Sequence, residues 1–184
     1  MNIYEVTLPV TDDMLAVLRA GDRIYLTGHL YTARDAAHRR IAQAIREGAA
    51  LPFPLDGESV YYAGPAPARP GHVSGPCGPT TSGRMDPYTP LLLENGLKVM
   101  IGKGERNNEV KEAIRRCGGI YLGVTGGAAA LTARCITESR TVAYEDLGAE
   151  AIRRYTVSRL PAIVLYDRFG GDLYLEGRNA YRQG

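Results

Sequence analysis

Three stretches of this chain share one arrangement, in which a short apolar run is followed by a turn and then by a helical pattern. The apolar runs occupy residues 23–27, 98–102 and 120–124, and the helical patterns after them end near residues 48, 116 and 134. Apolar runs that alternate with helices in this way indicate an α/β fold. We therefore expect a partly parallel sheet whose strands end at one common edge, where such proteins usually bind ligands.

Further elements are expected around these units. Residues 3–8 alternate apolar and polar side chains, which is typical of a half-buried strand, and residues 11–19 have helical spacing. Other strands are expected at 59–63, 136–144, 156–160, 162–167 and 172–176, with a short helix at 150–155. Residues 64–71 hold three prolines and read as an ordered loop rather than a linker, so we treat residues 1–184 as a single domain.

Composition argues against several classes of protein. The hydrophobic fraction is 45%, and no apolar run approaches the roughly 20 residues that span a bilayer. The net charge of +2 is too balanced for a nucleic-acid-binding surface. Residues 1–10 lack the basic and apolar regions of a signal peptide, so we expect a cytoplasmic protein without a membrane or nucleic-acid partner.

The cysteines give no pattern of metal ligands. Cys77, Cys117 and Cys135 are odd in number, lie far apart and form no Cys-x-x-Cys pair. We therefore expect neither a disulfide framework nor a self-contained zinc or iron–sulfur site in this chain. Cys77 is expected to line a wall of the motif that contains it rather than to bind a metal.

That motif runs from residue 75 to residue 86, with the sequence Gly-Pro-Cys-Gly-Pro-Thr-Thr-Ser-Gly-Arg-Met-Asp. The hydroxyl residues 80–82 are of types that cap helices, and an apolar run at 88–93 follows them. We expect unpaired backbone N–H groups at a helix start here, with Arg84 beside them. Such a helix start favours anions, although an ordinary capped helix is the alternative.

Two more cations follow predicted strands. Arg34 lies in the first turn of the helix that Thr32 is expected to cap, with Asp35 next to it and His38 one turn further on. An arginine is electrostatically misplaced at a helix N-terminus, which suggests an anionic partner. Lys103 follows another strand within Gly-Lys-Gly, but the spacing of a P-loop is absent. Taken singly, either cation could be a solvated surface residue, and His38 is expected to pack or to orient a neighbour.

These groups converge if the strands share one edge. Arg34, Arg84 and Lys103 then supply more positive charge than one monocarboxylate requires. A small dicarboxylate or a phosphate suits them, because the arginine fork pairs bidentately with a carboxylate while lysine supplies a point charge.

Five segments of the chain together form a recognisable set of motifs. They are Leu-Tyr-Thr-Ala-Arg-Asp-Ala-Ala-His (30–38), Gly-Pro-Thr-Thr-Ser-Gly-Arg-Met-Asp-Pro-Tyr-Thr-Pro (78–90), Gly-Lys-Gly (102–104), Thr-Gly-Gly-Ala-Ala-Ala (125–130) and Tyr-Glu-Asp-Leu-Gly (144–148). This set resembles the β subunit of class I fumarate hydratase and of the related L(+)-tartrate dehydratase. The resemblance covers essentially the whole chain, and its Thr-Thr-Ser-Gly-Arg-Met-Asp-Pro block is specific.

The resemblance implies both a fold and a partner. The fold would be a swivelling β/β/α domain, with a central mostly parallel sheet, a second antiparallel sheet and helices. The partner would be an α subunit, or an N-terminal domain in fused forms, whose three cysteines hold an oxygen-labile [4Fe-4S] cluster. A dimer of α–β pairs is the implied assembly, with a homodimer as the alternative for the isolated chain.

The resemblance also implies roles for individual residues. Arg34, Arg84 and Lys103 would hold substrate carboxylates and stabilise an aci-carboxylate, while the open iron of the partner's cluster acts on the substrate hydroxyl. Thr80 matches the threonine proposed as the base in this family, and it would bind substrate as well; Thr81 is its rival, and a purely structural cap is the other reading of Thr80. The supporting residues would be Asp35, His38, Thr81, Ser82 and Gly83.

Three functions therefore stay open. The first is reversible hydration of fumarate to (S)-malate as the β subunit of a fumarate hydratase. The second is dehydration of L(+)-tartrate to oxaloacetate by the same kind of site. The third is an anion-binding or scaffolding module without catalysis.

Overall fold

The computed structural model describes residues 1–125 and 128–182, so the expected turn at Gly126 and Gly127 lies outside the described residues. The strands are β1 (Ile3–Leu8), β2 (Arg23–Thr32), β3 (Ser59–Tyr61), β4 (Val99–Gly102), β5 (Ile120–Gly123), β6 (Ile136–Ala143) and β7 (Ile152–Tyr166). The helices are α1 (Asp12–Val17), α2 (Asp35–Glu47), α3 (Thr89–Glu94), α4 (Asn108–Cys117), α5 (Ala129–Cys135) and α6 (Leu173–Tyr181). Two 3₁₀ helices, η1 (Ser82–Met85) and η2 (Glu145–Glu150), complete the described elements. None of the described helices is long and apolar enough to cross a membrane.

The strands form one mixed, seven-stranded sheet in the order β1-β2-β3-β4-β5-β7-β6. Strands β1 to β5 pair in parallel, whereas β7 runs antiparallel to both β5 and β6. Strand β7 also pairs antiparallel with β2, so that β2, β3, β4, β5 and β7 close into a ring. The α/β expectation is confirmed, but the antiparallel strands are not a separate sheet, because β7 belongs to both parts.

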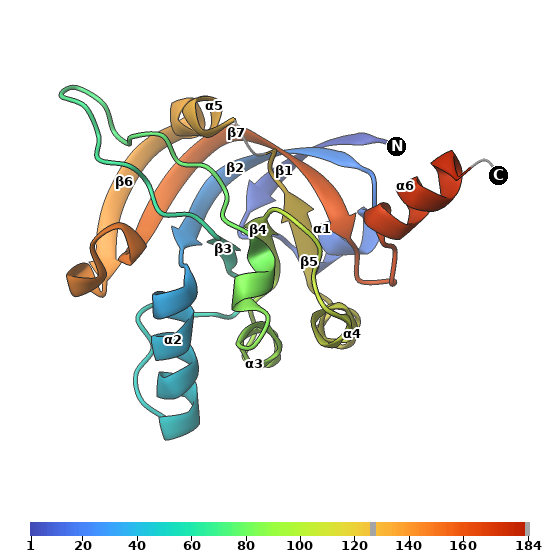
Figure 1. Cartoon of the computed structure of the whole chain (residues 1–184), viewed down its shortest axis with the longest axis horizontal. Coiled ribbons are helices and arrows are strands. Elements are labelled where there is room, and N and C mark those ends of the chain that lie inside the picture. The colour runs from blue at the N-terminus through green and yellow to red at the C-terminus, as the bar shows by residue number, and fades with distance from the viewer. Residues whose placement is uncertain (126–127, 183–184) are drawn as a thin grey trace.

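Side chains alternate between two apolar cores along the parallel strands, as the period of two in a strand requires. Val99 and Ile101 of β4 face a core that also contains Tyr155 and Val157 of β7, between the parallel and antiparallel strands. Met100 faces the opposite way, into a second core with residues of α2, α3 and α4. Figure 1 shows these three helices together on one side of the parallel strands, with β6, β7 and α5 on the other side.

Helix α4 begins and ends where the sequence predicts. Asn107 precedes it, and its side-chain oxygen accepts a hydrogen bond from the N–H of Val110 at 2.9 Å. Gly118 ends it in the left-handed conformation, with φ of 67°, which glycine adopts without a steric cost. Gly48 ends α2 in the same way.

The C-terminal third departs from the sequence-based expectation. The helix expected at 150–155 is wrong, because Glu150 ends η2 and residues 152–155 belong to β7, which also joins the two separate strands expected at 156–160 and 162–167. The strand expected at 172–176 is wrong as well, because α6 starts there. The Asp172 side chain accepts from the N–H of Leu175 at 3.0 Å, and the Glu176 carboxylate accepts from the N–H of Asp172 at 3.1 Å. These reciprocal caps outweigh the alternating pattern of the segment.

Strand β2 continues past Gly28, where it was expected to end. A Cβ at Gly28 would lie 2.4 Å from the carbonyl oxygen of Leu8, and the pairing of β2 with β7 shifts register beside it. Glycine therefore marks a bulge and a close approach of two strands rather than a strand end. As a result Thr32 is the last residue of β2 and not the cap of α2; Arg34 occupies the cap position and makes no side-chain capping bond.

Candidate active site at the carboxyl edge of the sheet

The parallel strands end level with one another at one edge of the sheet. Register pairs Thr32 of β2 with Tyr61 of β3, and Tyr61 with Ile101 of β4. The chain positions two residues beyond Thr32 and Ile101 are Arg34 and Lys103. Strand register therefore delivers both cations to the same edge, as the sequence pattern predicted.

The segment before η1 lies along this edge and is bonded to it. Thr81 forms a parallel bridge with Lys103, and the N–H of Ser82 donates to the carbonyl of Lys103 at 2.9 Å. The N–H of Thr80 donates to the carbonyl of Tyr62 at 2.7 Å. Backbone hydrogen bonds thus fix Thr80 and Thr81 next to Lys103.

This pairing corrects the expectation of free N–H groups at residues 80–82. The N–H groups of Thr80 and Ser82 are already bonded to the sheet edge. The α-helix that follows, α3, starts only at Thr89, while η1 is a single short turn in which the carbonyl of Gly83 accepts from Asp86. An α-helix N-terminus therefore does not supply the anion-binding character of residues 80–82.

Two arginines meet around Asp35 at the start of α2. The Nε atom of Arg84 lies 2.9 Å from the Asp35 carboxylate, and Nη2 of Arg34 lies 3.8 Å from it. Nη2 of Arg34 also lies 3.4 Å from the Glu150 carboxylate, whose other oxygen accepts from the N–H of Ala36 at 3.1 Å. The start of α2, rather than residues 80–84, thus provides the helix N-terminus of the site, and Glu150 occupies it.

These carboxylates reduce the charge of the site. Arg34, Arg84 and Lys103 are three cations, whereas Asp35 and Glu150 are two anions, which leaves one net positive charge. The side chain of Arg34 is 24% exposed and that of Arg84 is 53% exposed, so both guanidinium groups remain accessible from solvent. The positive excess is smaller than the sequence suggested, and an incoming dianion would compete with Asp35 and Glu150.

A chain of hydroxyl groups supports the loop that carries Lys103. The Tyr121 hydroxyl donates to the carbonyl of Gly104 at 2.8 Å and lies 2.8 Å from the Ser82 hydroxyl. Ser82 in turn accepts from the N–H of Lys103 at 3.0 Å. A Cβ at Gly102 would lie 2.0 Å from the Ser82 oxygen, so only glycine leaves room for this contact. Ser82 is therefore a buried support, whereas Lys103 is exposed.

His38 is fully buried beneath Arg34. Its Nδ1 atom lies 2.9 Å from the carbonyl of Arg34, which only accepts, so the proton is on Nδ1. Burial, the largest cause, lowers the pKa of His38 to about 4, and the charge of Arg106 acts in the same direction. The Nε2 atom has no hydrogen-bond partner in the described part of the chain. His38 therefore contacts the Arg34 backbone as a neutral imidazole, and its part in catalysis stays a prediction.

The depressed pKa of His38 predicts how stability depends on pH. Between about pH 6.5 and pH 4, unfolded His38 binds a proton that the folded imidazole refuses, so the free energy of unfolding should fall as the pH is lowered through this window. The difference amounts to roughly 3 kcal/mol. Urea denaturation at several pH values measures it, and His38→Gln should flatten the dependence. An unchanged slope in that variant would contradict the buried, neutral state.

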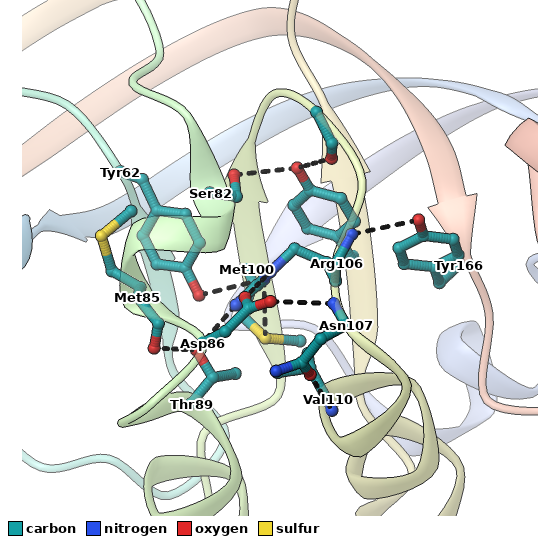
Figure 2. A network of polar contacts seen from close by, with 12 residues as sticks. Tyr62, Ser82, Met85, Asp86, Thr89, Met100, Arg106, Asn107, Val110 and Tyr166 are labelled. Atoms are coloured by element: carbon teal, nitrogen blue, oxygen red, sulfur yellow. Dashed lines mark hydrogen bonds and ion pairs between the residues drawn. The ribbon is translucent and has the colours of Figure 1, made fainter.

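Sequence reasoning missed three charged residues of this region: Asp86, Arg106 and Glu150. The Arg106 side chain is fully buried, and its Nε donates to the Asp86 carboxylate at 2.6 Å (Figure 2). Burial lowers the pKa of Arg106, but the neighbouring Tyr62 and Asp86 outweigh it and the net pKa is raised, so the guanidinium stays charged. The only sequence signal for this ion pair was that Asp86 belongs to the motif at residues 75–86. Arg106 lies in a polar run, which predicts an exposed residue.

The candidate site is an open edge. Two hollows of the described residues lie elsewhere: one of about 550 Å³ is lined by the loop at residues 67–76 and by α5, and one of about 480 Å³ is lined by α4 and the start of α6. Neither is lined by Arg34, Thr80, Arg84 or Lys103. The arrangement can hold a small anion against its cations, and both arginine side chains are partly exposed to solvent there.

The cysteines do not fit an iron–sulfur cluster. Cys77 is buried in the core between the parallel and the antiparallel strands. Burial raises the pKa of its thiol to about 11 and so disfavours the thiolate that binds metals. Cys117 ends α4 and Cys135 ends α5. In the described residues, no three His, Cys, Asp or Glu side chains gather as a metal-binding group. These cysteines are therefore unsuited to hold such a cluster.

Comparison with known proteins supplies a family. Residues 2–177 match the family described as Fumarase C-terminus. The anaerobic class I fumarate hydratase of Escherichia coli K12 is 42% identical over 154 residues, and fumarate hydratase 2 of Leishmania major is 40% identical over 156 residues. The matches include 83% and 84% of this chain, which spans 28% of the length of each of these relatives.

Shorter relatives match along most of their own length. The L(+)-tartrate dehydratase subunit beta of Escherichia coli K12 is 32% identical over an alignment of 185 positions, which covers 97% of this chain and 90% of the relative. The putative L(+)-tartrate dehydratase subunit beta of Methanocaldococcus jannaschii is 34% identical over 165 residues, or 86% of this chain and 85% of the relative. Matched along nearly its whole length, the chain belongs to the Fumarase C-terminus family.

Proposed function

We propose that this chain is the β component of a two-part hydro-lyase that converts fumarate and (S)-malate into one another. The observation that carries the proposal is the meeting of Arg34, Arg84, Lys103 and Thr80 at one open sheet edge. It is supported by 40–42% identity to proteins named fumarate hydratase.

The residues of the edge suit the chemistry at the substrate carboxylates. Removing water from malate takes a proton from the carbon next to one carboxylate, and negative charge then builds up on that carboxylate. Arg34, Arg84 and Lys103 would stabilise this charge, because preformed cations cost little reorganisation at the moment of reaction. Thr80 is the proposed acceptor of the proton, with Thr81 as the alternative. A threonine hydroxyl is a poor base, so the role depends on the nearby cations.

Substrate binding would replace internal ion pairs. Without a ligand, Asp35 pairs with both arginines and Glu150 pairs with Arg34. A dicarboxylate would take over part of these contacts, so its binding energy is reduced by the cost of breaking them. In return the guanidinium groups are held near their working positions before the substrate arrives, which lowers the ordering cost.

Tartrate is the second candidate substrate. The two tartrate dehydratase subunits are 32% and 34% identical to this chain, which is less than the fumarate hydratases. They nevertheless match it over 85–90% of their length, so a protein of this extent serves as a named subunit. We therefore propose fumarate as the substrate, within the separate-subunit arrangement of the tartrate enzymes. The third candidate function is a non-catalytic anion-binding module, and it would apply if no partner activates the chain.

The proposed partner covers the open edge. We propose that an α subunit holds the [4Fe-4S] cluster there, because the cysteines of this chain are buried or separated. Membership of the swivelling β/β/α fold type, a dimer of α–β pairs and a cytoplasmic location belong to the same proposal.

The partner dependence can be measured directly. The purified chain alone should show no fumarate hydration, whereas mixing it anaerobically with a reconstituted α subunit should produce activity that is followed by ultraviolet absorbance. The reason is that the cysteines of this chain are buried or separated, and that its described residues form no group suited to hold a cluster. Turnover by the chain alone, without iron, would refute the two-part enzyme.

A further inference from the structure

Arg106 connects two segments of the candidate site that are distant in sequence. Its Nε donates to one Asp86 oxygen at 2.6 Å, and its Nη2 donates to the Thr89 hydroxyl at 2.7 Å. The other Asp86 oxygen accepts from the N–H of Asn107 at 2.8 Å. Figure 2 shows Arg106 reaching across from the start of α4 to the segment between η1 and α3. Residues 106 and 107 thus donate to both oxygens of Asp86, and these hydrogen bonds join the end of the motif at residues 75–86 to the loop at residues 103–107.

The two aromatic rings beside Arg106 extend the connection to the substrate edge. The guanidinium carbon lies 5.3 Å from the centre of the Tyr62 ring and 5.0 Å from that of Tyr121. The backbone carbonyl of Tyr62 accepts from the N–H of Thr80, and the Tyr121 hydroxyl contacts Ser82. Arg106 therefore contacts both tyrosines, Tyr62 and Tyr121, that are hydrogen-bonded to the segment from Thr80 to Ser82.

Packing alone does not explain a buried charge at this point. Replacing a buried ion pair with apolar residues of similar volume is often neutral or stabilising, because the pair first has to lose its hydration. What Arg106 adds is direction, since its planar fork fixes Asp86 and Thr89 at defined distances and angles. The side chain is fully buried and touches no solvent, so it does not itself bind the substrate.

We propose that Arg106 is a positioning residue: it holds the segment from Asp86 to Thr89 against the loop after Lys103, and so keeps the backbone pairing of Thr81 with Lys103 in its working geometry. This inference rests on the proposed function for its catalytic consequence, but its structural part holds without it. When the fork is lost, η1 and the Lys103 loop separate slightly and the substrate contacts they provide no longer act together. An arrangement that is about 1 Å too loose can cost on the order of 100-fold in rate.

The test combines activity with amide hydrogen exchange, and it uses the assembled enzyme and the free chain. Arg106→Lys keeps the charge but loses the fork, and Thr89→Val removes one acceptor at nearly constant shape. The matched control is Lys111→Gln, which breaks a partly buried ion pair, 2.7 Å long, between α4 and Asp172.

We expect Arg106→Lys to lower kcat by about 10- to 100-fold while KM changes less than about threefold, and Thr89→Val to lower kcat about fivefold. In the free chain, amides at residues 80–86 and 103–106 should exchange at least about tenfold faster in Arg106→Lys, while those of β1 and α2 are unchanged. Lys111→Gln should show neither effect.

Equal losses in Lys111→Gln, or faster exchange spread evenly over the whole chain, would overturn the proposal, because Arg106 would then act only through global stability. If Arg106→Lys does not fold, Thr89→Val decides by the same two measurements. The exchange result does not depend on turnover. An inactive wild-type assembly would therefore refute the proposed function, while faster local exchange in the variant would still support the positioning role.

Discussion

Replacing Thr80 with alanine is expected to lower kcat of the assembled enzyme by at least about 100-fold, the range of a positioned acid or base. The variant should fold, because the N–H of Thr80 donates to Tyr62 through the backbone and keeps that bond without the side chain. Thr80 does not cap an α-helix, since α3 starts at Thr89. The roughly 1 kcal/mol that a lost cap would cost is therefore not expected. The arginines remain in place, so KM should change little.

Two controls separate Thr80 from its neighbour. Thr80→Ser keeps a hydroxyl and should retain most of the activity, whereas Thr81→Ala alters an exposed residue on the same segment. Exchange of deuterium from solvent into the malate methylene group reports proton abstraction even when net hydration is slow. If exchange persists in Thr80→Ala but disappears in Thr81→Ala, the base is Thr81.

Arg84→Lys is expected to reduce kcat/KM by on the order of 100-fold, or about 3 kcal/mol of transition-state stabilisation. The arginine already uses Nε to contact Asp35 at 2.9 Å, and its remaining N–H groups can meet a substrate carboxylate at the same time. A lysine ammonium is a single point and cannot serve both partners with the same geometry. Steady-state kinetics of the assembled enzyme measure the loss.

The matched control for this variant is Arg115→Lys. Arg115 has the same side-chain exposure of 53% and also pairs with a carboxylate, that of Glu112, but it lies on α4. Surface ion pairs of this kind contribute little, so the control should be indistinguishable from wild type. If Arg84→Lys changes kcat/KM less than threefold, Arg84 does not hold the substrate.

Local sequence signals predicted those parts of the fold that local interactions determine. The Asn107 cap and the Gly118 terminator fix α4, because both act within a few residues of the helix ends. Strand β7 could not be recognised in this way. Ile152 and Tyr155 are both buried and stand three residues apart, which imitates a helix, whereas the strand is imposed by β2 and β6 on its two sides.

The candidate site likewise has parts that local sequence predicts and parts that depend on distant segments of the chain. Placing Arg34 and Lys103 at one edge needs only the parallel order of the strands, and the structure brings them there. The carboxylates that offset their charge come from other places: Asp35 was visible beside Arg34, but Glu150 reaches the site through a distant 3₁₀ helix. Arg106 is hidden for a related reason, since no periodic pattern marks a charged residue as buried.

The ring formed by β2, β3, β4, β5 and β7 has a consequence for how the chain acquires its structure. Arg23 of β2 pairs with Ile163 of β7, so the two residues that meet there are 140 positions apart. Closing so long a loop has to precede the gain from the contact, which slows folding relative to locally paired proteins. During synthesis, one edge of β2 therefore waits without its partner until β7 has left the ribosome. In that interval the unpaired edge is a place where the nascent chain is open to wrong pairing.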